Sequence, residues 1–107
     1  MHTLLDKYHI LIFSEVEDFL TKIPETDSAK MLAHISFLKT GDFITVSVKT
    51  LRSPLKELRV KNYRIIFFIQ DSHLYIISCF IKKTQKTQSE EIILSKKRFS
   101  EITYEKK

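Results

Sequence analysis

The strongest constraint on the fold is the short spacing between three apolar, strand-like segments in the second half of the chain. These segments are LKELRVK, YRIIFFIQ and LYIISCFI, at residues 55–61, 63–70 and 74–81. Asn62 alone separates the first two, and the tripeptide Asp71–His73 separates the second from the third. Connections this short join only antiparallel neighbours, because a parallel pair needs a crossover of about a dozen residues or more. The sequence therefore predicts a three-stranded antiparallel meander.

The first half of the chain predicts one strand and then a helix. Tyr8–Phe13, with the sequence YHILIF, is short, apolar and rich in strand-forming residues. Ser14 and Glu17 match a capping box, in which two side chains satisfy free N–H groups at the start of a helix. The helix is expected over Glu15–Ile23, and Pro24 ends it.

A second helix is expected from about Ser28 to Thr40, closed by Gly41. Its apolar residues recur at helical spacing and fall on one face: Met31, Leu32, Ile35 and Leu38. The two helices are expected to form a hairpin. The next segment, 42–54, is left open, because its apolar residues fit either a short strand or an ordered connection.

The end of the chain predicts a third helix, over Ser89–Tyr104, with Thr87 and Glu90 as a second capping box. Its expected core contacts are Ile92, Phe99 and Ile102. Together these elements predict a single α+β domain over residues 1–107. Its small sheet of about four strands is expected to be mostly antiparallel, packed with an N-terminal helical hairpin and a C-terminal helix.

Missing motifs exclude several classes of function. A single glycine is too few for the phosphate-binding and nucleophile-positioning loops that depend on several. The four histidines lack metal-ligand spacing, and one cysteine excludes a cysteine-rich zinc site, so we expect no metal and no cofactor. No apolar run approaches the roughly 20 residues of a membrane helix, and no signal-peptide pattern is seen. We therefore expect a cytoplasmic protein without a membrane partner.

Positive charge is concentrated in the second half of the chain. Eighteen Lys and Arg stand against thirteen Asp and Glu, a net charge of +5, although the first 29 residues are net acidic. Arg59 and Arg64 flank the first turn of the meander, so they should lie nearly opposite each other on one sheet face. Such like charges repel unless an anion or a carboxylate lies between them, and Glu57 is the nearest candidate. Two interpretations stay open, a phosphate clamp or solvated arginines paired to Glu57.

A lysine-rich segment follows the last predicted strand, with Lys82, Lys83 and Lys86. In a three-stranded meander the third strand ends near the start of the second, so these lysines are expected beside Arg64 and Arg59. Such a cationic patch suits RNA cleavage, in which a 2′-hydroxyl attacks the neighbouring phosphate and the growing charge must be stabilised. A solubilising loop is the alternative interpretation.

Two stretches carry a family resemblance, SPLKELRVKNYRIIFFI at 53–69 and LYIISCFIKKTQKTQSEEI at 74–92. They closely resemble the RelE/HigB-like toxins of type II toxin–antitoxin systems, and best the phage-derived branch. The resemblance covers about Lys49–Phe99 and implies the RelE-like form of the α+β fold. It also implies an mRNA endoribonuclease that acts in the ribosomal A site and inhibits translation. A cognate antitoxin, often a helix-turn-helix protein, is the implied partner.

Carried over by position, the resemblance implies four catalytic residues. Arg64 is expected on the scissile phosphate, where it stabilises transition-state charge, and Arg59 is expected to position the substrate. Lys82 or Lys83 is expected to transfer a proton or to stabilise the leaving group. Further substrate contacts are expected from Lys86, Lys61 and Tyr63.

Two positions depart from the family pattern. Glu57 stands where some relatives carry a basic residue that serves as general base. Its carboxylate either points to the other sheet face or serves as the base itself, so the base is unassigned and Glu57 is kept among the substrate-binding candidates. Gln88 stands where many relatives carry Pro before the last helix. The alternative function is a non-catalytic module that binds RNA, the ribosome or a protein partner.

Overall fold

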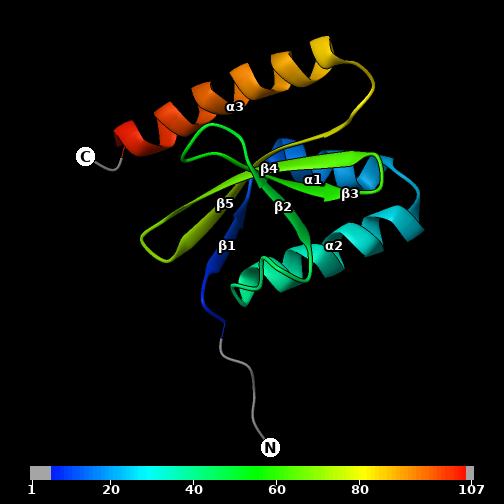
Figure 1. Cartoon of the computed structure of the whole chain (residues 1–107), viewed down its shortest axis with the longest axis horizontal. Helices are drawn as coiled ribbons and strands as arrows, with labels where there is room; N and C mark the ends of the chain where they lie inside the picture. The colour runs from blue at the N-terminus through cyan, green and yellow to red at the C-terminus, as the bar shows by residue number, and fades with distance from the viewer. Residues whose placement is uncertain (1–5, 106–107) are drawn as a thin grey trace, which may run out of the picture.

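The computed structural model describes residues 6–105, and the side chains of residues 6–103. In chain order the elements are β1 (His9–Ile12), α1 (Ser14–Lys22), α2 (Glu25–Lys39), β2 (Ser47–Thr50), β3 (Lys56–Val60), β4 (Tyr63–Gln70), β5 (His73–Ile81) and α3 (Gln85–Glu105). The strands form one sheet, with α1 and α2 packed on one face and α3 on the other (Figure 1). Within the described residues, every helix is too short or too polar to cross a membrane.

The predicted meander is confirmed, and two further strands extend it. The sheet order is β1-β5-β4-β3-β2, in which β1 runs parallel to β5 and the other neighbours are antiparallel. The expectation of about four strands is one too few, because the segment left open supplies β2. This edge strand has a single half-buried apolar residue, Val48, and so carries little strand signal in the sequence.

Alternation along β4 divides its side chains between two cores. Tyr63 and Ile65 pack toward α1 and α2, whereas Ile66 and Phe68 pack toward α3. By the same alternation Arg64 faces the α3 side of the sheet. The α3 side is therefore the side on which a site built around Arg64 must lie.

The two N-terminal helices run antiparallel as a hairpin (Figure 1), but they begin elsewhere than predicted. α1 begins at Ser14, whose hydroxyl donates to the Glu15 carboxylate at 2.7 Å and caps no N–H group. The first predicted capping box is wrong, because the N-cap position is taken by Phe13. α2 begins at Glu25 rather than Ser28, directly after a two-residue connection.

One residue predicted for the buried face of α2 lies on its surface. Met31, Ile35 and Leu38 are buried as predicted, but Leu32 is 47% exposed. A step of one residue rotates a side chain by about 100° around a helix, which turns Leu32 away from the sheet that Met31 contacts. Gly41 closes α2 as predicted, with a φ of +85° in the left-handed region.

α3 begins at Gln85, four residues before the predicted start. The Thr84 hydroxyl accepts a hydrogen bond from the Thr87 N–H at 3.1 Å, so Thr84 is the cap. The second predicted capping box is therefore wrong, because the same polar segment offers a cap one turn earlier, and Lys86 lies in the helix rather than in a loop. The predicted core contacts of the helix are confirmed: Ile92, Phe99 and Ile102.

Candidate functional site

Two opposing arginines and one carboxylate form the centre of the candidate site. The pairing of β3 with β4 places Arg59 directly opposite Arg64, as the turn length predicts. Arg59 Nε donates to Glu57 Oε1 at 2.9 Å, and Arg64 Nε lies 4.0 Å from the same oxygen. The carboxylate lies between the two cations and offsets their repulsion, which is the pairing that the sequence suggested.

Glu57 is fully buried on the α3 side of the sheet, the same side as the arginines. Its second oxygen, Oε2, accepts a hydrogen bond from Gln88 Nε2 of α3 at 3.0 Å. A general base must reach the proton that it removes, whereas both oxygens of this carboxylate are occupied by protein donors. The geometry therefore favours Glu57 as a residue that positions the arginines over Glu57 as a base.

Arg64 is held by the backbone of the turn that precedes it. Its Nη1 donates to the carbonyl oxygens of Lys61 and Tyr63 at 3.0 and 2.8 Å. The side chain is only 12% exposed, and Nε is buried without a hydrogen-bond partner. Arg59 has 36% of its side chain exposed, so it is more accessible to a ligand than Arg64 is.

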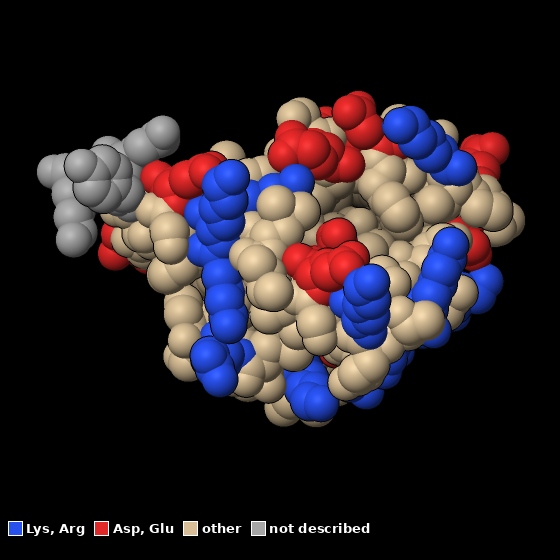
Figure 2. All heavy atoms as spheres, turned by 90° about the horizontal axis from the view of Figure 1, so that it is seen from above, with Lys and Arg blue, Asp and Glu red and all other residues tan. Residues whose placement is uncertain are grey.

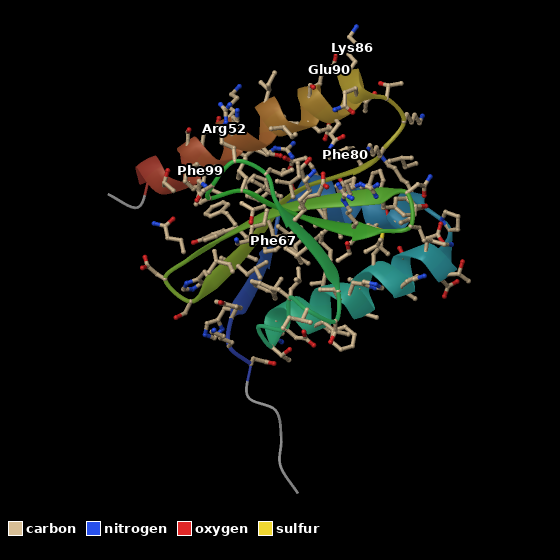
Figure 3. The ribbon with its side chains drawn as sticks, viewed as in Figure 1. Arg52, Phe67, Phe80, Lys86, Glu90 and Phe99 are labelled. Atoms are coloured by element: carbon tan, nitrogen blue, oxygen red, sulfur yellow. The ribbon has the colours of Figure 1, made fainter. Side chains whose placement is uncertain are left out.

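The lysines after β5 divide into two groups. The Lys82 N–H donates to the Asn62 carbonyl at 2.8 Å, which brings the end of β5 beside the β3–β4 turn as expected. Lys82 and Lys83 are exposed at this end of β5. Lys86 instead projects from the first turn of α3 away from the sheet (Figure 3), so the structure does not bring it to the arginines.

The side chains of Lys61 and Tyr63 do not lie with those of the arginine pair, Arg59 and Arg64. Both bind Asp27 of α2 on the opposite side of the sheet, through Lys61 Nζ and Tyr63 OH, each at 2.7 Å from a carboxylate oxygen. These bonds lower the pKa of Asp27 and raise that of Tyr63. Tyr63 is also buried, with its ring near-perpendicular to that of Phe19. The arrangement gives Tyr63 a role in holding the turn and leaves no free ring face for a base.

Two residues that organise the site were not found by sequence reasoning. Asp27 of α2 reaches Tyr63 of β4 across 36 positions of sequence, and Gln88 of α3 reaches Glu57 of β3 across 31 positions. Neither belongs to a motif, although the departure at Gln88 marked that position. Their roles depend on the packing of helices on the sheet.

Other chemistries find no support in the described residues. No group of three or more His, Cys, Asp or Glu comes together to hold a metal between residues 6 and 105. Burial raises the pKa of the Cys79 thiol to about 12, so it stays protonated and unreactive.

From the α3 side, basic side chains gather at the end where α3 begins and in a second band farther along, with acidic side chains between them (Figure 2).

The architecture defines a fold class, the RelE-like α+β proteins. The chain matches a chain of the archaeal RelE–RelB complex from Pyrococcus horikoshii OT3 with a TM-score of 0.64 and 19% identity, over 71% of this chain and 96% of that chain. At this identity the likeness shows the fold. Residues 18–100 match the phage-derived Gp49-like proteins, and the chain belongs to that family. The resemblance seen in the sequence is thereby confirmed for family and fold. No curated protein matches the chain.

Proposed function

We propose that this chain is the toxin of a type II toxin–antitoxin system and cleaves mRNA on the ribosome. The observation that carries the proposal is the opposed pair Arg59 and Arg64, organised by buried Glu57, at a turn whose Asn62 carbonyl accepts a hydrogen bond from the backbone of exposed Lys82. Guanidinium groups match phosphate oxygens, and clustered cations stabilise the charge of a phosphoryl transition state. Membership of the family and the RelE-like fold support a toxin role.

In the proposed reaction the 2′-oxygen of one nucleotide attacks the adjacent phosphorus. The bond from phosphorus to the 5′-oxygen then breaks, which leaves a 2′,3′-cyclic phosphate and a 5′-hydroxyl. Arg64 and Arg59 hold the phosphate and stabilise its charge, and Lys82 or Lys83 protonates the departing 5′-oxygen. Glu57 acts through the arginines, and the group that removes the 2′-proton is unassigned.

The proposed partners are a cognate antitoxin and the ribosome. The matched solved structure is itself a RelE–RelB complex, which supports a protein partner for this chain. The helix-turn-helix type of that partner and the A-site substrate come from the sequence resemblance. The cytoplasmic location is proposed because no apolar run in the sequence approaches the length of a membrane helix.

The test is a primer-extension map of a defined mRNA incubated with the purified protein, with and without translating ribosomes. The double variant Lys82→Gln/Lys83→Gln should cut at least about 10²-fold more slowly, the usual contribution of a proton-transfer group. The matched control is Lys96→Gln/Lys97→Gln, an exposed pair about 16 Å along α3 from its first residue. It should cut like the unchanged protein.

Each result decides between specific alternatives. The whole proposal is supported if cleavage occurs at the A site and requires ribosomes. That cleavage must also be lost in Lys82→Gln/Lys83→Gln and retained in Lys96→Gln/Lys97→Gln. Cuts without ribosomes would keep the nuclease and change its substrate. A folded, unchanged protein that makes no cut would contradict the enzyme and favour a non-catalytic binding module.

A further inference from the structure

The second half of β5 is open on one side. β1 pairs only with His73–Ile76 of β5, so in the described structure residues 77–81 have no strand neighbour on that side. α1 packs along this open part of the sheet and leaves a hollow of about 300 Å³. The lining residues come from α1, β5, the connection after it and α3: Phe19, Phe80, Ile81, Lys83 and Thr87.

This hollow lies close to Arg64 of the arginine pair. Phe80 is paired with Arg64 across β4 and β5, and residues so paired have Cα atoms about 5 Å apart. Lys83 follows Lys82, whose N–H is bonded to the β3–β4 turn. In Figure 3, Phe80 lies at the end of the sheet below the start of α3. A ligand with its phosphate at Arg64 therefore has the hollow within reach of its next group.

The chemistry of the lining suits a flat ring that carries polar edge atoms. The walls are two phenyl rings and one isoleucine side chain, while Lys83 and Thr87 supply an ammonium group and a hydroxyl. Bases in single-stranded RNA are bound in this way, by stacking on apolar or aromatic side chains and by hydrogen bonds to their edges. The volume is at the lower end of the range of about 300–1,000 Å³ for ligand pockets, which suits one ring system.

We propose that this hollow binds one base of the RNA, on a nucleotide adjoining the phosphate at Arg64. The inference rests on the proposed function and deepens it, since it assigns a base-binding subsite to Phe19 and Thr87. An apolar side chain of a protein partner would also fit the walls. The cations of Lys83 and Arg64 favour a ligand that brings phosphate with it.

The test uses short RNAs that bind without being cleaved, because a 2′-deoxy nucleotide replaces the attacking hydroxyl. One RNA keeps all its bases, and a series lacks one base at each position in turn. Loss of one base next to the blocked phosphate should weaken binding about fivefold or more in the unchanged protein, as expected for loss of a stacked base. Binding is measured by fluorescence anisotropy.

Two variants examine the hollow itself. Phe19→Leu removes a ring wall, and Thr87→Leu fills the hollow from a half-buried position. In both, the intact RNA should bind about fivefold more weakly and removal of the base should have no further effect. The matched control Phe37→Leu changes a 43% exposed phenylalanine on α2 and should keep the unchanged protein's sensitivity to that base.

The outcomes separate this inference from the proposed function, since these RNAs are never cut. Binding that depends on one base through Phe19 and Thr87, in a protein that cuts no mRNA, would keep the subsite and remove the enzyme. Cleavage with equal binding of intact and base-free RNAs would overturn the subsite alone. A base effect that persists in both hollow variants would also overturn it.

Discussion

At the scale of single residues, Glu57 determines how the two arginines are presented. A carboxylate removed from water is costly unless it is paired and hydrogen-bonded, and Arg59 and Gln88 provide one bond to each of its oxygens. Because one negative charge faces two positive ones, the trio keeps a net positive charge for a ligand. The bond to Glu57 holds the Arg59 guanidinium in place, and the backbone bonds hold that of Arg64.

Replacing Glu57 with Gln should therefore destabilise the fold as well as impair the proposed cleavage. Removing one partner of a buried ion pair leaves the other charges uncompensated, and both arginines here keep some contact with water. We expect the free energy of unfolding to fall by about 2–4 kcal/mol, measured by urea denaturation. The control Glu90→Gln, on the exposed face of α3, should change it by less than about 0.5 kcal/mol. Lost cleavage with unchanged stability would instead make Glu57 the base.

Asp27 should make stability depend on pH in the acid range. Hydrogen bonds from Lys61 and then Tyr63 hold the pKa of Asp27 below its ordinary value of 3.8. A carboxyl group with a lowered folded pKa stabilises the protein fully above the unfolded pKa, and that stability is lost as the pH falls through the folded pKa. Asp27→Asn should thus lower stability near neutral pH and flatten its decline as the pH falls through and below 3.8.

Urea unfolding at a series of pH values measures this difference. The control is Asp18→Asn, at an exposed position on α1. An acid decline of equal size in the unchanged protein and in Asp27→Asn would contradict the role of Asp27.

At the scale of elements, the first turns of α3 complete the site. Gln88 donates to Glu57 of β3, and the Glu91 carboxylate accepts a hydrogen bond from the Ser78 hydroxyl of β5 at 2.9 Å. These two polar contacts fix the start of the helix over the sheet, and apolar contacts continue along the rest of it. The site thus needs a docked helix as well as a meander.

Replacing Gln88 with Ala should loosen this part of α3. A hydrogen bond to a charged group contributes about 1.5–3 kcal/mol, and Glu57 has no contact with water to replace it. We expect a loss of that size in the free energy of unfolding and faster amide hydrogen exchange in the first half of α3. Ser89→Ala, at the next and exposed position, is the control. Equal exchange rates in the two variants would show that the Gln88 contact does not hold the helix.

The same elements show which features a sequence can predict. The meander and the opposition of Arg59 and Arg64 follow from short connections, which leave only one register. The start of α3 does not, because Thr84 and Thr87 are both suitable caps one turn apart. The contact between Gln88 and Glu57 accompanies the earlier start of α3, at Gln85. Contacts of this kind join distant positions, so local pattern carries no signal for them.

At the scale of the whole molecule, the net charge of +5 is unevenly placed. One group of cations lies where α3 begins and a second band lies farther along, with acidic side chains between them (Figure 2). The arginine pair flanks the β3–β4 turn, which is bonded to the backbone at the end of β5, shortly before α3 begins. If RNA binds at the arginines, only the first group should contribute to the electrostatic part of binding to a short RNA.

The salt dependence of binding measures that contribution. For single-stranded nucleic acid, the slope of log affinity against log salt concentration is about −0.7 for each phosphate contact. Lys82→Gln/Lys83→Gln should therefore make the slope shallower by up to about 1.4 with a short uncleavable RNA. Lys96→Gln/Lys97→Gln removes the same charge from exposed positions farther along α3 and should leave the slope unchanged. Equal changes of the slope in both variants would mean that RNA binding depends on net charge alone. The arginine pair would then not be the binding site.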